Sequence, residues 1–134
     1  MAKRILIVDD SAYLRVALRT ALEAKLEVTC AEATDGRDAV NRALELNPDV
    51  IVLDLSMPVM NGLEAAPYLK RLLPAVPIVM FTTFKGKGLL ALARKAGISI
   101  VVGKESPDEL VAAVRTLISD TSLSSRRYAP SSAP

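Results

Sequence analysis

Five short apolar runs, separated by longer segments of helical periodicity, dominate this chain of 134 residues. The runs lie at residues 4–8, 28–31, 50–53, 78–81 and 98–102. Three of them, ILIV, VIVL and IVMF, are continuously apolar and rich in β-branched residues. Strands buried on both faces have this composition, whereas half-exposed strands alternate apolar and polar residues. The pattern therefore predicts a parallel sheet that is covered on both faces.

The segments between the runs have the apolar spacing of helices. Four helices are expected over residues 11–25, 37–46, 63–72 and 88–96, and a fifth is expected to begin at Pro107, directly after Ser106. Ser11 and Ser106 are suitable N-caps, and proline is favoured at a first helical position. Gly97 suits the left-handed residue that often ends a helix.

The same spacing indicates which helix faces are buried. Val40, Ala43 and Leu44 align on one face of the second helix, and this face is expected to be apolar. Pro67 strains the third helix, because proline lacks an amide proton and is tolerated only near a first turn. The third helix is therefore expected to start late or to bend.

Five β–α repeats with short connections imply a right-handed, three-layer α/β sandwich. Residues 1–121 have the length and apolar content of a single domain. The sequence that follows, rich in serine and proline, has little to bury. Residues 122–134 are therefore expected to be a disordered tail or the stub of a linker.

Composition narrows the classes of function. The apolar runs are too short to cross a bilayer or to serve as a secretory signal, and the single cysteine, Cys30, excludes an intramolecular disulfide; we expect a cytoplasmic protein. A net charge of +2 is too small to argue for nucleic-acid binding through this domain. The chain has no histidine, which excludes a histidine kinase, a Ser-His-Asp triad and imidazole ligation of zinc.

Polar residues follow four of the five predicted strands. Asp9 and Asp10 follow the first strand, Asp54 the third, Thr82 the fourth and Lys104 the fifth. Ligands of open parallel sheets bind outside the carboxyl ends of the strands. Three carboxylates, a hydroxyl and an ammonium are therefore expected to converge at one edge of the sheet.

Three neighbouring carboxylates are difficult to keep ionised without a cation. Magnesium is the natural candidate, because it is a hard ion that accepts a few carboxylates and keeps several waters. A carboxylate beside Mg²⁺, with an ammonium and a hydroxyl opposite, suits in-line phosphoryl transfer. The simpler alternatives are a solvated loop in which Asp10 or Ser11 caps the first helix, an ordinary surface lysine at Lys104 and a strand-end hydroxyl at Thr82.

Over about residues 3–119 the chain resembles the receiver domain of bacterial two-component response regulators. The resemblance is carried by the acidic pair of VDD, by DLSMPVMNG, by the threonine of MFTT and by the lysine of VVGK. It implies a flavodoxin-like (βα)5 fold with a five-stranded parallel sheet in the order 2-1-3-4-5. It also implies a signalling switch rather than an enzyme, one that catalyses only its own phosphorylation and dephosphorylation.

The resemblance also implies roles for individual residues. Asp54 would accept a phosphoryl group from a histidine kinase or phosphotransfer protein. Mg²⁺ would be held by Asp9, Asp10, Asp54 and the backbone carbonyl of Ser56. Lys104 would pair with the phosphoryl group, and Thr82 would move to hydrogen-bond it. The expected output is a changed surface for a downstream protein target or for a second copy of the chain.

Two positions depart from the usual receiver pattern. Val101 stands where many receivers carry an aromatic residue that swings inward on activation, and Glu105 follows the lysine where proline is usual. An acidic residue at the second position is common in LuxR-like receivers, which VMFTTF also resembles.

Three other functions stay open. One is an interaction module that works without phosphate, which Val101 favours. Another is a receiver cut from a DNA-binding transcription regulator. The third is a phosphohydrolase of the haloacid-dehalogenase type, which needs an aspartate where this chain has Ser56.

Overall fold

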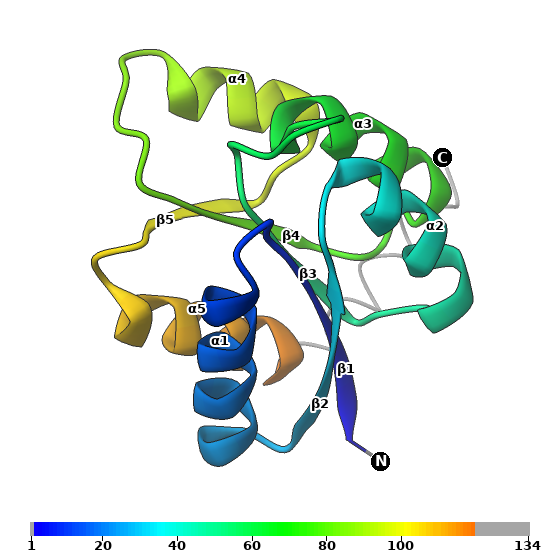
Figure 1. Cartoon of the computed structure of the whole chain (residues 1–134), viewed down its shortest axis with the longest axis vertical. Helices are drawn as coiled ribbons and strands as arrows, with labels where there is room; N and C mark the ends of the chain where they lie inside the picture. The colour runs from blue at the N-terminus through cyan, green and yellow to red at the C-terminus, as the bar shows by residue number, and fades with distance from the viewer. Residues whose placement is uncertain (1, 120–134) are drawn as a thin grey trace.

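Five strands alternate with five helices within residues 2–119, the part of the chain that the computed structural model describes (Figure 1). The strands are β1 (Lys3–Val8), β2 (Val28–Ala33), β3 (Val50–Leu53), β4 (Ile78–Thr82) and β5 (Ile100–Gly103). The helices are α1 (Ala12–Lys25), α2 (Gly36–Leu46), α3 (Gly62–Leu72), α4 (Leu89–Ala96) and α5 (Pro107–Ser119). The expectation for residues 122–134 lies outside the described residues.

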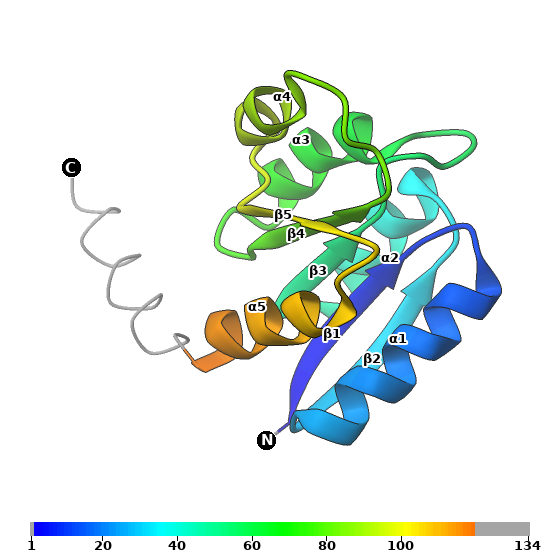
Figure 2. The same cartoon turned by 90° about the vertical axis from the view of Figure 1, so that its left-hand side faces the viewer.

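The strands form one parallel sheet in the order β2-β1-β3-β4-β5, which confirms the predicted order. Helices α1 and α5 cover one face of the sheet, and α2, α3 and α4 cover the other (Figures 1 and 2). The fold is therefore the predicted three-layer sandwich. Within the described residues, no helix combines the length and the apolarity that crossing a bilayer requires.

Each central strand contributes side chains to two separate hydrophobic cores, which explains its unbroken apolar sequence. In β1, Ile5 and Ile7 pack toward α1 and α5, whereas Leu6 and Val8 pack toward α2, α3 and α4. All four side chains are at most 1% exposed. Because successive strand residues point to opposite faces, a sheet covered on both sides needs apolar residues at every position.

The buried face of α2 and the starting point of α3 differ from what was expected. The side chain of Leu44 is 59% exposed, because the buried face of α2 is formed by its small residues Gly36, Ala39 and Ala43. Helix α3 does not start late: it begins at Gly62 and continues through Pro67, whose missing hydrogen bond falls on an exposed side of the helix.

Capping explains the early start of α3. The Asn61 side chain accepts a hydrogen bond from the Glu64 amide, and the Glu64 side chain accepts one from the Asn61 amide, both at 2.9 Å. This capping box fixes the first turn before the proline is reached.

Strand β5 begins two residues later than predicted. Gly97 adopts a left-handed conformation with φ of 96° and ends α4, as expected. Ile98 follows directly and is buried in the core between the sheet and α3 and α4 before the strand begins. Its apolar side chain therefore reflects packing in the loop rather than strand structure.

Candidate functional site

Strand register places Asp9 beside Asp54. Val8 of β1 pairs with Leu53 of β3, and each is followed directly by one of these aspartates. The Asp54 amide donates a hydrogen bond to the Val8 carbonyl at 3.0 Å, and the Asp9 amide donates to the Ala33 carbonyl of β2 at 3.1 Å. The strand ladder thus continues to both aspartates and holds their main chains at the carboxyl edge of the sheet.

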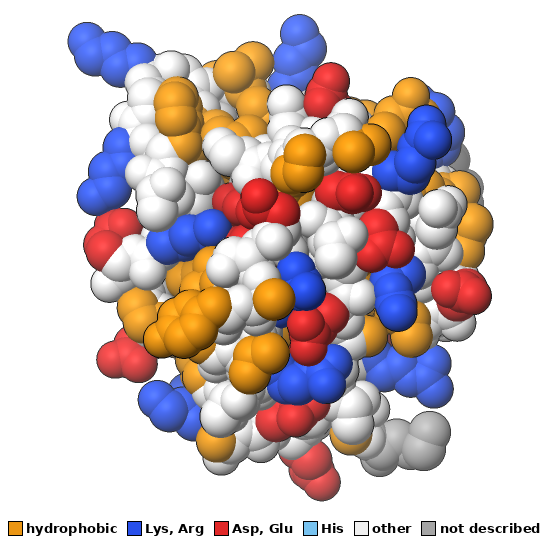
Figure 3. All heavy atoms as spheres, viewed as in Figure 1, with side chains coloured by type: hydrophobic (Ala, Val, Ile, Leu, Met, Phe, Trp, Pro, Cys, Tyr) orange, Lys and Arg blue, Asp and Glu red, His pale blue; other side chains and the backbone are white. Residues whose placement is uncertain are grey.

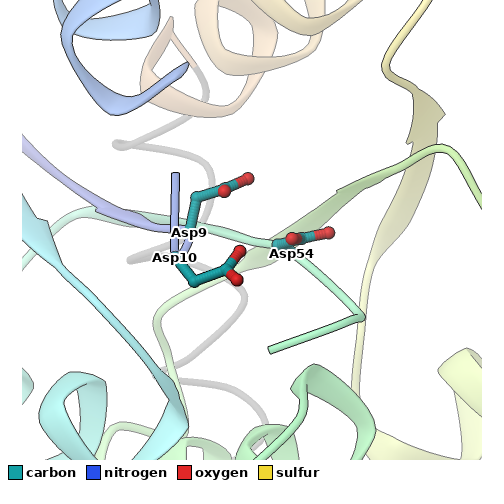
Figure 4. A group of neighbouring side chains, drawn as sticks. All are labelled: Asp9, Asp10 and Asp54. Atoms are coloured by element: carbon teal, nitrogen blue, oxygen red, sulfur yellow. The ribbon is translucent and has the colours of Figure 1, made fainter. Parts of the chain in front are cut away.

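Three carboxylates meet at this edge (Figure 4). One oxygen from each of Asp9, Asp10 and Asp54 lies within 4.8 Å of the other two. Asp9 and Asp54 are buried, with exposed fractions of 2% and 5%, whereas Asp10 is exposed. Figure 3 shows acidic side chains near the centre of the face where Figure 1 shows the end of β1.

Lys104 directly follows β5 and contacts the two buried carboxylates across the end of β4. Its Nζ lies 2.8 Å from Asp9 Oδ2 and 3.2 Å from Asp54 Oδ2. The Lys104 amide donates a hydrogen bond to the Thr82 carbonyl at 3.0 Å, so the pairing of β4 with β5 sets its position. One ammonium faces three carboxylates, so the cluster retains negative charge.

The closeness of these charges shifts the pKa values of Asp54 and Lys104. Burial, followed by the charge of Asp9, raises the pKa of Asp54 from 3.8 to about 6, although Lys104 acts in the opposite direction. Burial lowers the pKa of Lys104, but its hydrogen bond to Asp9 and the charges of both aspartates outweigh burial and raise it overall. The lysine therefore stays charged, while Asp54 is ionised at a cost.

The other predicted site residues lie at the same edge but differ in their contacts. Thr82 is 2% exposed, and its hydroxyl accepts a hydrogen bond from the Phe84 amide at 3.1 Å. Ser56 is exposed and lines an open hollow of about 590 Å³ together with Asp10 and Phe84. The carboxylate cluster therefore borders a solvent-filled space that can admit a ligand.

Gly62 allows the loop after β3 to fold back onto the site. Its amide donates a hydrogen bond to the Leu55 carbonyl at 2.8 Å. A Cβ atom at this position would lie only 2.2 Å from the backbone oxygen of Asp54. The loop that carries Ser56 can therefore pack closely against the end of β3 only with glycine at position 62.

Sequence reasoning did not identify Arg15. Its Nη1 donates a hydrogen bond to the Asp9 carbonyl at 2.7 Å, and its Nε donates to Glu32 of β2 at 2.9 Å. A signal was present, because Arg15 lies three residues before Leu18 and seven before Leu22, on the buried face of α1. A charged residue on a buried stripe requires a partner.

Comparison with known proteins agrees with this geometry. The family model of the response regulator receiver domain matches residues 5–115. A protein-glutamate methylesterase/protein-glutamine glutaminase of Caldanaerobacter subterraneus subsp. tengcongensis is 38% identical over 125 residues, covering 84% of this chain and 34% of that protein. The chemotaxis protein CheY of Thermotoga maritima is 34% identical over 115 residues, covering 85% of this chain and 96% of that protein.

A solved structure of a response regulator is also similar to this chain. A LuxR-family two-component response regulator from Aurantimonas sp. SI85-9A1 matches with a TM-score of 0.83 and 31% identity, covering 89% of this chain and 86% of that one. The chain spans about a third of the methylesterase but nearly all of CheY. By sequence, by strand order and by the residues at its sheet edge, the chain belongs to the response regulator receiver domain family.

Proposed function

We propose that this domain is a phosphorylation-dependent signalling switch in which Asp54 accepts a phosphoryl group. The observation that carries the proposal is the convergence of Asp54 with two further carboxylates and one partly buried lysine. The donor would be the phosphohistidine of a histidine kinase or phosphotransfer protein, and the compartment would be the cytoplasm.

The residues fit a hard divalent cation. The cluster offers only oxygen donors, and two of its three carboxylates are buried beside a single ammonium. Such a set matches the preference of Mg²⁺ for carboxylates and water. Asp9, Asp10, Asp54 and the backbone carbonyl of Ser56 would hold the ion. When bound, Mg²⁺ would neutralise charge on the phosphoryl oxygens.

In the transfer itself, the Asp54 carboxylate would act as the nucleophile. One Asp54 oxygen would bond to phosphorus while the bond from phosphorus to the imidazole nitrogen of the donor breaks. The electron pair of that bond stays on the imidazole, which leaves as the neutral side chain because its other ring nitrogen already carries a proton. Lys104 already lies 3.2 Å from Asp54 and would contact a phosphoryl oxygen from the same direction.

Thr82 would convert the modification into a conformational change. Its hydroxyl accepts a hydrogen bond from the Phe84 amide in this structure. A phosphoryl group, with a charge near −2, would attract the Thr82 O–H as a donor. A contact that exists in only one state shifts the equilibrium by about 1–3 kcal/mol. The changed surface would then bind a downstream protein or a second copy of the chain.

Acetyl phosphate and Mg²⁺ test the proposal directly, because they supply a phosphoryl donor without a kinase. We expect intact-protein mass spectrometry to show the addition of one phosphoryl group to the wild type and none to Asp54→Asn. Phosphotransfer profiling against candidate histidine kinases, with the same variant as control, would then identify the donor. A wild type that never gains the group, or a variant that still does, would contradict the proposal.

We also retain a more specific version, in which the domain is the receiver of a DNA-binding regulator. The similarity to a LuxR-family response regulator over 89% of this chain supports it. The sequence of the full-length gene tests it, because a helix-turn-helix domain after residue 134 is expected. A full-length gene without such a domain would leave the switch itself as the function.

A further inference from the structure

We propose that Arg15 is a positioning residue for the cation site: it holds the turn of residues 9–11 so that the carboxylates of Asp9 and Asp10 face Asp54. Arg15 itself contacts neither the expected ion nor the phosphoryl group. The inference rests on the proposed function, because it assumes that the three carboxylates bind Mg²⁺.

Hydrogen bonds fix Asp9 from several directions. Its amide donates to the Ala33 carbonyl, its Oδ1 accepts from the Ser11 amide at 2.9 Å, and its Oδ2 contacts Lys104. The Asp9 carbonyl, which belongs to the peptide that leads into Asp10, accepts from Arg15 Nη1 at 2.7 Å. Arg15 therefore determines the orientation of the peptide group that joins the two acidic residues.

Asp10 depends on that peptide group more than its neighbours do. It is exposed, and its carboxylate accepts no hydrogen bond from any residue in the range 2–119. No side-chain contact therefore holds it toward Asp54 before a cation binds. Its position follows from the main chain of the turn, which Arg15 restrains.

The guanidinium is itself held in place by the neighbouring strand. Glu32 of β2 binds Arg15 Nε at 2.9 Å through one oxygen and Arg19 Nε at 3.3 Å through the other. The Arg15 side chain is 13% exposed and the Glu32 side chain 24%. A planar guanidinium that contacts a carboxylate and a carbonyl together is rigid, which suits a positioning role.

Charge and position predict opposite effects of removing Arg15. A guanidinium bonded to Asp9 repels a divalent cation, so electrostatics alone would make an uncharged residue at position 15 strengthen Mg²⁺ binding. A positioning role predicts weaker binding instead. The sign of the change therefore separates the two effects in a single measurement.

Arg19 provides a matched control. It lies one helical turn after Arg15, carries the same charge and contacts the same Glu32, but it bonds to the Cys30 carbonyl at 2.7 Å instead of to Asp9. Arg19→Met thus removes one charge and one Glu32 contact without touching the turn of residues 9–11.

The experiment is isothermal titration of the wild type, Arg15→Met, Arg15→Lys and Arg19→Met with Mg²⁺, repeated with Mn²⁺ followed by electron paramagnetic resonance. Arg15→Met is expected to raise the metal Kd about tenfold, the usual effect of losing a group that orients a metal ligand. Arg19→Met is expected to change Kd by less than about twofold. Arg15→Lys keeps the charge but bonds only one partner, so an intermediate loss of about threefold is expected.

Thermal unfolding of each variant without metal separates misfolding from a local effect. If Arg15→Met does not fold, the comparison of Arg15→Lys with Arg19→Met decides the question. Unchanged or tighter binding by the Arg15 variants, or equal weakening by Arg19→Met, would overturn the inference. A wild type that binds neither Mg²⁺ nor Mn²⁺ would overturn the proposed function as well, which distinguishes the two failures.

Discussion

Replacing Asp54 by asparagine is expected to stabilise the metal-free protein, although it removes the residue on which the proposed function depends. Asp54 is 5% exposed and lies beside the charge of Asp9, and both features disfavour its ionised form. Asparagine has nearly the same shape and carries no charge. Functional sites often retain such unfavourable arrangements at the expense of stability.

The size of the effect follows from the pKa of Asp54. Its pKa rises from the ordinary value of 3.8 to about 6. At about 1.4 kcal/mol for each tenfold change in proton affinity, ionising Asp54 in the folded state costs about 3 kcal/mol at pH 8. Asp54→Asn is therefore expected to raise the free energy of unfolding by about 2–3 kcal/mol and the melting temperature by about 10 °C.

The stability difference between the wild type and Asp54→Asn is expected to depend on pH. Because the pKa of Asp54 is higher in the folded state, that state binds more protons than the unfolded state between about pH 4 and pH 6. The contribution of Asp54 to the free energy of unfolding of the wild type therefore becomes less unfavourable as the pH falls through that window. The advantage of Asp54→Asn is full above about pH 7 and disappears near pH 4.

Urea unfolding in EDTA at several pH values, followed by circular dichroism, measures this difference. Saturating Mg²⁺ is expected to stabilise the wild type, because the ion binds only the folded state. The difference in stability between the wild type and Asp54→Asn should therefore become smaller. Asp10→Asn is the control: it removes an exposed ligand, so it should weaken the response to Mg²⁺ while changing metal-free stability by less than about 1 kcal/mol. An Asp54→Asn protein that is less stable than the wild type in EDTA at pH 8 would refute the reasoning.

Three further predictions concern the rest of the fold. Burial and the charge of Glu23 raise the pKa of Cys30 to about 12. Alkylation of Cys30 by iodoacetamide at pH 8 should therefore be about a thousandfold slower than that of an ordinary thiol, and denaturant should restore the ordinary rate. A fast reaction of the native protein would contradict this. Leu69→Ala should cost about 3 kcal/mol in urea unfolding because Leu69 is fully buried, whereas a cost above about 1 kcal/mol for Leu44→Ala would contradict its exposed position. Gly62→Ala should lower stability by more than about 2 kcal/mol and weaken Mg²⁺ binding in calorimetry, because the new Cβ would collide with the Asp54 carbonyl; full affinity would show that the loop adapts freely.

Much of the fold could be predicted because its signals are local. The continuous apolar runs required a sheet covered on both faces, and β3 has the predicted bounds. The strand-end rule also identified the acidic residues that the structure brings together, since parallel strands present their carboxyl ends at one edge. Their roles in binding Mg²⁺ and phosphate remain proposals.

Local signals were insufficient where another element decides the outcome. Helical spacing permitted Leu44 on the buried face of α2, but the space against the sheet accommodates the smaller residues Ala39 and Ala43. Pro67 was expected to delay or bend α3, but the helix is not delayed, because the capping box before the proline starts it. Ile98 was predicted to begin a strand, but it lies in the loop after Gly97, and its apolar side chain packs into the core.

The sequence by itself determined which residues stand at the strand ends, because side-chain periodicity and strand length are properties of neighbouring residues. Only the tertiary structure decided how those residues act on one another. The raised pKa of Asp54, the pairing of Lys104 with two carboxylates and the bond from Arg15 to Asp9 all depend on strand register and helix packing. Register joins residues that are distant along the chain, and burial then strengthens every charge interaction between them.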